Sequence, residues 1–145
     1  MVLVYRISMV QDRPYAANYA IGLLVVMGFH MAFNSLSVLL YPELFRSEMY
    51  RETFFLYLFI GVSIWEFILA AMLFMGSGLS HKLAVASMVL VLILIVGNIL
   101  IGGVIGFDIW FQVALGASVL IFLLLPNVRG FYDNWSLGKL PDTEL

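Results

Sequence analysis

Four long runs of apolar residues divide the chain, and short polar stretches separate them. The runs cover residues 16–40, 54–75, 83–105 and 109–125. A helix of about 20 residues rises roughly 30 Å, which matches the thickness of a bilayer's hydrocarbon core. The pattern predicts an all-α fold, an integral membrane four-helix transmembrane bundle that occupies residues 1–145 as a single domain.

Two of the polar stretches have a pattern of their own. Tyr41 and Pro42 end the first run, since proline disfavours helical geometry in the residue before it. In 43–53, charged residues alternate with apolar residues at near-helical spacing, which predicts a short amphipathic helix on the membrane surface between spans 1 and 2. The C-terminal tail, 126–145, combines basic residues with aromatic residues typical of interfacial anchors: Phe131, Tyr132 and Trp135.

The composition is typical of a membrane protein and limits the kinds of partner that the chain can bind. Only 11% of the 145 residues are charged and 63% are hydrophobic, whereas soluble domains have roughly 25% charged residues. A net charge of -2 provides no basic surface, so we expect membrane lipid as a partner and no nucleic acid. The absence of cysteine excludes thiolate catalysis and Cys-ligated metal centres.

The basic residues also predict an orientation. Four spans place both termini on the side of the 76–82 turn, and five of the seven Lys and Arg residues fall on that side. By the positive-inside rule we expect a multi-pass protein with cytoplasmic termini, in a prokaryotic plasma membrane or an organelle inner membrane.

One acidic residue lies near the middle of the second run. Glu66 is the only charged residue there, and a charge at that depth costs several kcal/mol unless it is paired, protonated or wetted. His30 on the first span shares its depth, which makes both residues catalytic candidates for a proton relay or a quinone site. With them we group a polar intramembrane cluster: His30, Asn34, Ser63, Glu66 and Asn98. The alternative is that these side chains only form hydrogen bonds between helices.

The sequence predicts no metal and no cofactor held by this chain alone. His30 and His81 are the only histidines, and His81 lies far from His30 in depth, so one chain cannot supply a bis-His haem. A quinone or lipid at a subunit interface stays open, as does a metal shared with another subunit.

Small residues in the last two runs predict close helix packing. Glycine and serine let helix backbones approach each other, within the chain or between chains. The candidate packing positions are Gly97, Gly102, Gly106, Gly116 and Ser118.

The run EFILAAMLFMGSGLSHKLAVASMVLVLI, residues 66–93, resembles the DoxX-like family of four-helix membrane proteins. The shared elements are an acid that begins a small apolar half-helix, a glycine turn, and a basic residue that opens the next helix. Here these are Glu66, Gly76 with Gly78, and Lys82. The family is associated with membrane redox processes, so the resemblance implies an accessory role in such a process.

Three functions are compatible with the sequence. The favoured hypothesis is a small non-catalytic accessory subunit of a larger membrane complex, of respiratory or redox metabolism, that binds other integral membrane subunits. The first alternative is a DoxX-like membrane oxidoreductase component with a quinone or proton site at His30 and Glu66. The second is a small oligomeric transporter.

Overall fold

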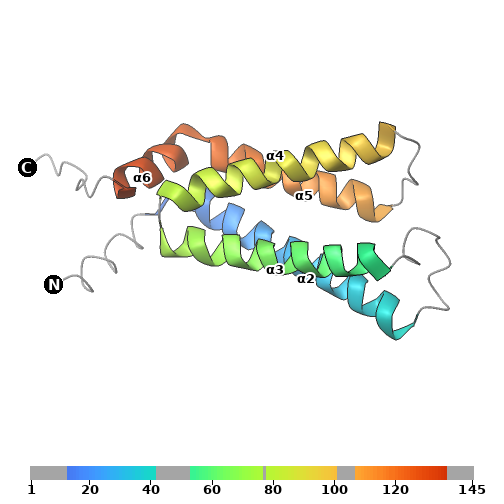
Figure 1. The fold of residues 1–145 in the computed structure, drawn as a ribbon. Helices are drawn as coiled ribbons and strands as arrows, with labels where there is room; N and C mark the ends of the chain where they lie inside the picture. The colour runs from blue at the N-terminus through green and yellow to red at the C-terminus, as the bar shows by residue number, and fades with distance from the viewer. Residues whose placement is uncertain (1–12, 42–52, 77, 101–106, 137–145) are drawn as a thin grey trace, which may run out of the picture.

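The computed structural model describes residues 13–41, 53–76, 78–100 and 107–136 (Figure 1). These residues form helices and no strand, which confirms the predicted all-α class. The five helices are α2 (Tyr15–Leu40), α3 (Thr53–Met75), α4 (Gly78–Leu100), α5 (Phe107–Leu124) and α6 (Pro126–Ser136). The predicted interfacial helix at 43–53 lies outside the described residues, apart from its last position.

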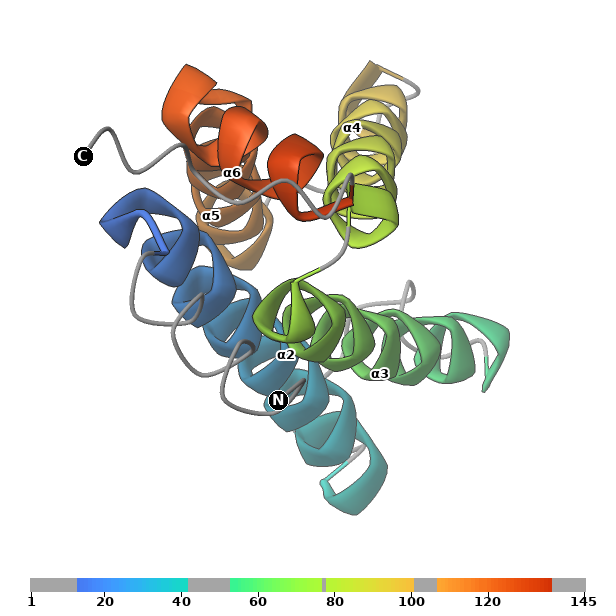
Figure 2. The ribbon, with the colours of Figure 1, turned by 90° about the vertical axis from the view of Figure 1, so that its left-hand side faces the viewer.

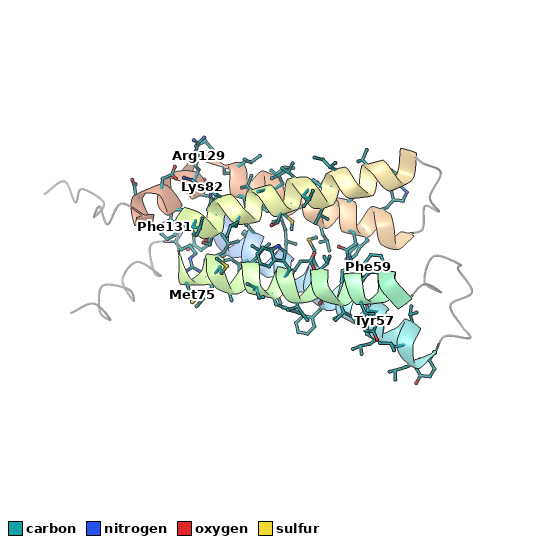
Figure 3. All side chains as sticks on the ribbon, in the orientation of Figure 1. Tyr57, Phe59, Met75, Lys82, Arg129 and Phe131 are labelled. Atoms are coloured by element: carbon teal, nitrogen blue, oxygen red, sulfur yellow. The ribbon has the colours of Figure 1, made fainter. Side chains whose placement is uncertain are left out.

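Helices α2 to α5 form an up-down-up-down bundle, in which each helix runs antiparallel to the next (Figure 1). Along the bundle axis, α2 lies between α3 and α5, and α4 lies beside α5 (Figure 2). Helix α6 packs across one end of α4 and α5. We call this the inner end; it carries Lys82, Arg129 and Met75, while Tyr57 and Phe59 lie toward the opposite, outer end (Figure 3).

The connection between α3 and α4 is short because Gly76 ends α3 in a left-handed conformation. Its φ is 71°, and its N–H lies 3.2 Å from the Met72 carbonyl oxygen and 3.1 Å from that of Leu73. Glycine has no Cβ to oppose this geometry, which is common at helix C-termini. Helix α4 then begins at Gly78, so His81 and Lys82 lie in its first turns and not in the loop that the sequence suggested.

The connection between α5 and α6 is a sharp bend. The axes of 110–124 and 126–134 differ by 63°. Pro126 lacks an N–H and cannot continue the hydrogen bonds of α5, but its fixed φ suits the first turn of a new helix. The chain therefore turns back over the inner end, and the tail predicted at 126–145 contains a helix.

The core follows one stripe on each helix at spacings of three and four residues. On α2 this stripe contains Ala17, Ala20, Leu24 and Met27, all fully buried. Leu69 and Leu73 on α3, Met88 on α4, and Val119 and Leu123 on α5 pack in the same cluster. Tyr132 of α6 is also fully buried. This residue differs from the prediction of an interfacial anchor, because the bend at Pro126 points it into the bundle.

Among the described helices, only α2 is by itself long and apolar enough to cross a membrane. There are two candidate spans if the bent pair of α5 and α6 counts as one. The apolar stretches of α3 and α4, Phe59–Met75 and Gly78–Ile93, are shorter. The structure thus identifies one or two candidate membrane helices, and not the four that the sequence predicts.

Candidate functional site

Glu66 lies on the core-facing stripe of α3. Ser63 precedes it by three residues and Leu69 and Leu73 follow it by three and seven, and all of these residues are buried. The Glu66 side chain is fully buried, and neither carboxylate oxygen has a hydrogen-bond partner among the described residues. Burying a charged carboxylate without a partner costs several kcal/mol, so this position favours a neutral acid or a bound ligand.

A close approach between α2 and α3 fixes the level of Glu66 in the bundle. The Ser63 hydroxyl donates a hydrogen bond of 2.8 Å to the carbonyl oxygen of Gly28. The Phe67 ring lies 3.0–3.2 Å from the position that a Cβ on Gly28 would occupy. Since Ser63 and Phe67 flank Glu66, the carboxyl lies level with the part of α2 around Met27 and Gly28.

His30 forms a second polar group with a residue that the sequence analysis missed. Its Nδ1 lies 2.7 Å from Gln112 Nε2 on α5, and its Nε2 lies 3.4 Å from Asn34 Nδ2. Amide nitrogens only donate and a neutral imidazole has one acceptor nitrogen, so the shorter contact, from Gln112 Nε2 to Nδ1, is a donated hydrogen bond, and the ring N–H at Nε2 can bond Asn34 only through the amide oxygen. The imidazole also packs against Phe111, with 4.8 Å between ring centroids. The His30 group thus bridges α2 and α5.

The predicted five-residue cluster is divided in the structure. His30 and Asn34 lie together, whereas the Ser63 hydroxyl bonds to the backbone of α2. The Glu66 carboxyl forms no hydrogen bond with any of these residues. Between the His30 and Glu66 side chains there is no hydrogen bond. The side chain of Asn98 lies outside the described residues.

The candidate packing residues have different surroundings. A Cβ on Gly116 would lie 3.6 Å from Leu92 of α4 and 3.8 Å from Met27 of α2, so this glycine sits where three helices meet. Ser118 donates to the Ala114 carbonyl of its own helix at 2.7 Å, and Gly97 faces open space. Gly102 and Gly106 lie outside the described residues.

Three side chains at the inner end donate to the last carbonyls of α3 and α5. Arg13 donates to the Phe74 carbonyl and lies over the Phe74 ring, and the Tyr132 hydroxyl donates to the Leu73 carbonyl at 2.9 Å. His81 Nε2 lies 2.8 Å from the Leu123 carbonyl, which requires a proton on Nε2. Helix C-termini leave carbonyls unpaired and carry partial negative charge, so these donors stabilise both ends.

Burial changes the pKa values of two side chains at the inner end, Arg13 and Tyr132. It lowers the pKa of the Arg13 guanidinium, a shift that nearby Tyr132 opposes. It raises the pKa of the Tyr132 hydroxyl to about 12, against the opposing effect of the Arg13 cation. The Tyr132 ring stacks on His81, with 5.3 Å between centroids. No pattern in the sequence predicts that the C-terminal tail folds back so that Tyr132 contacts Leu73 and His81.

Chemically, the described residues offer one isolated carboxyl, and several of their other polar groups form hydrogen bonds between helices: at His30, at Ser63, between Trp65 and Ser87, and at the inner end. They contain no group of three His, Asp or Glu residues placed to hold a metal ion. No family model matches the chain, and neither a curated protein nor a solved structure shows significant similarity to it.

Proposed function

We propose that the chain crosses a membrane four times, through α2, α3, α4 and α5. The support is the distribution of polarity between interior and surface. Buried positions include Ser35, Ser63, Glu66 and Gln112. Exposed positions along the same helices carry large apolar side chains: Val26, Phe29, Ile64, Ile68, Val89, Leu90, Ile93 and Ile121. Water would favour the reverse arrangement, whereas lipid favours this one.

The positions of the charges support the same proposal. Apart from Glu66, the described charged side chains lie at the inner end: Arg13, Lys82, Arg129 and Asp133. Helices α2, α3 and α4 have 26, 23 and 23 residues, and α5 has 18, which rises about 27 Å. With slight thinning of the bilayer, all four helices reach across the hydrocarbon core.

Within that membrane, the chain acts as a non-catalytic accessory subunit of a larger complex. The observation that carries this proposal is that several of the described interior polar side chains join one helix to another. Ser63 joins α3 to α2, Gln112 joins α5 to α2, and Tyr132 joins α6 to α3. Such bonds hold a bundle together, and the apolar exterior is left to contact lipid and other integral membrane subunits. A quinone or lipid fits at such a subunit interface.

The process that the complex serves is proposed from sequence alone. The resemblance of residues 66–93 to the DoxX-like family points to respiratory or redox metabolism. It concerns Glu66, the glycine turn and Lys82.

Gentle detergent extraction tests the accessory role. The tagged chain is purified from its native membrane, separated by native size, and analysed by mass spectrometry. An unrelated four-span protein with the same tag, extracted in parallel, controls for nonspecific capture. Fixed stoichiometry with larger membrane subunits is the expected result. A homo-oligomer without other subunits contradicts the accessory role and favours the small transporter.

A further inference from the structure

Helices α3 and α4 are joined by a side-chain hydrogen bond on the exterior of the bundle. The Trp65 indole N–H donates to the Ser87 hydroxyl oxygen at 3.1 Å, and 39% of the Trp65 surface is exposed. The two helices meet near the turn at Gly76 and diverge toward the outer end, so this bond spans the side on which they separate (Figure 1 and Figure 2). We call the exposed and partly exposed residues around it, Gly61, Trp65, Ser87 and Leu90, the α3–α4 seam.

The Ser87 hydroxyl has a hydrogen left to donate. Ser35 and Ser118 each donate to the carbonyl oxygen four residues earlier in their own helix, at 2.8 Å and 2.7 Å, and Ser63 donates to the backbone of α2. Ser87 instead accepts from Trp65, and its own O–H has no acceptor among the described residues. Since a hydroxyl both donates and accepts, the seam presents one unsatisfied donor.

This donor lies near the middle of the proposed membrane crossing. Trp65 is one residue from the midpoint of α3 and Ser87 is two residues from that of α4, which places both within about 3 Å of the bilayer centre. Hydrocarbon chains offer no acceptor at this depth, and the lipid headgroup region begins roughly 15 Å away. An unpaired donor in hydrocarbon costs free energy, so the position favours an acceptor from a protein.

The surface beside this donor leaves room for a helix. Gly61, one turn outward of Trp65, is exposed, and nothing lies within 4 Å of the position that a Cβ would occupy there. Leu90, one turn outward of Ser87, is also exposed. Glycine lets a second helix backbone approach closely in a membrane, and polar side chains then form hydrogen bonds across the contact. A small residue beside an unsatisfied donor suits a helix better than a lipid chain.

We propose that the α3–α4 seam binds a transmembrane helix of another subunit, which packs against Gly61 and presents a hydrogen-bond acceptor to Ser87. The acceptor is the side-chain amide or carboxyl oxygen of a residue near the middle of that helix. This inference rests on the proposed accessory role and deepens it, since it assigns the contact with the partner to one side of the bundle.

Glycine replacements at matched positions test the surface. The tagged full chain is extracted gently from its native membrane, and the ratio of partner subunits to this chain is measured by native-size separation and quantitative mass spectrometry. Gly61→Leu should lower this ratio about tenfold or more, because the new side chain occupies the space of the partner helix. Gly22→Leu is the control: Gly22 lies on the exposed face of α2, also with nothing within 4 Å of its Cβ position, and the ratio should not change.

The donor is tested by comparing Ser87→Ala with Trp65→Phe. Both variants lose the bond between these two side chains, whereas only Ser87→Ala loses the hydroxyl offered to the partner. The partner subunits should therefore dissociate about threefold to tenfold faster from Ser87→Ala than from Trp65→Phe.

The outcomes separate this inference from the accessory role. If wild type retains its partner subunits and Gly61→Leu and Ser87→Ala behave as their controls do, the seam is not the contact, although the accessory role stands. If Ser87→Ala instead loses a bound quinone while Gly61→Leu retains the subunits, the seam holds a quinone and the proposed helix is wrong. A wild-type homo-oligomer without other subunits would overturn both the seam and the accessory role.

Discussion

Gly28 lies at a close approach between α2 and α3. In Gly28→Ala the new Cβ would meet three atoms of the Phe67 ring at 3.0–3.2 Å, so the ring or the helix must move. Overpacking of this kind costs about 1 to 3 kcal/mol. We expect a lower thermal unfolding temperature in detergent, followed by tryptophan fluorescence.

Gly22→Ala on the same helix is the matched control. Nothing lies within 4 Å of its Cβ position, and alanine favours a helix over glycine by about 1 kcal/mol. This variant should be as stable as the wild type or slightly more stable. Equal destabilisation by both substitutions would contradict the close approach at Gly28.

We expect the folded protein to lose stability at alkaline pH because Tyr132 is buried. Its pKa is raised from 10.0 to about 12 in the folded protein, so the folded state retains a proton that the unfolded chain releases. The contribution of this group is complete below pH 10 and is lost as the pH rises toward 12, by about 2 to 3 kcal/mol. Tyr132→Phe should lose less stability over this window, while at neutral pH it costs about 1 kcal/mol for the missing bond to Leu73. Parallel pH profiles of wild type and variant would contradict this account.

Residue-level features were only partly predictable from the sequence. The depth of Glu66 follows from counting along an apolar run, and so does that of His30. Their partners do not, because α3 is apolar on every side, so periodicity gives no indication of which face is inward. Gln112 was missed because the rotation of α5 about its axis, which the sequence does not specify, brings its side chain to His30.

Helix α6 is held by two side chains on one face. Val128 and Tyr132, four residues apart, are fully buried, while Arg129 and Asp133 form an exposed pair at 3.7 Å that contributes little. Val128→Ser removes buried apolar contacts and adds a buried hydroxyl, which should cost about 2 to 3 kcal/mol and release α6 from the bundle. Chymotrypsin cleavage after Tyr132 should then accelerate. Arg129→Ser, on the exposed face, should leave cleavage unchanged, and acceleration in this control would contradict the assigned docking face.

At the scale of elements, the sequence located the helices better than their ends. Long apolar runs predict α2 to α5 because length and apolarity are local properties. The early start of α4 depends on the left-handed Gly76, and the existence of α6 depends on how Pro126 redirects the chain. Aromatic and basic residues in the tail indicate an interface as readily as a helix, so Tyr132 in the core could not be predicted.

At the scale of the whole molecule, lipid around the bundle explains both the large apolar side chains on its exterior and the polar side chains buried inside it. Four membrane crossings are therefore the central claim of the account.

The most direct test is single-cysteine labelling in intact cells, which the cysteine-free sequence allows without background. A membrane-impermeant maleimide should label Tyr41→Cys in intact cells, and Lys82→Cys and Arg129→Cys only after permeabilisation. Ile68→Cys and Ile121→Cys, exposed on the bundle surface but predicted to face lipid, should resist labelling until detergent is added. If these two positions react as fast as Lys82→Cys in cells that are permeabilised without detergent, water surrounds the bundle and the four-span account is wrong.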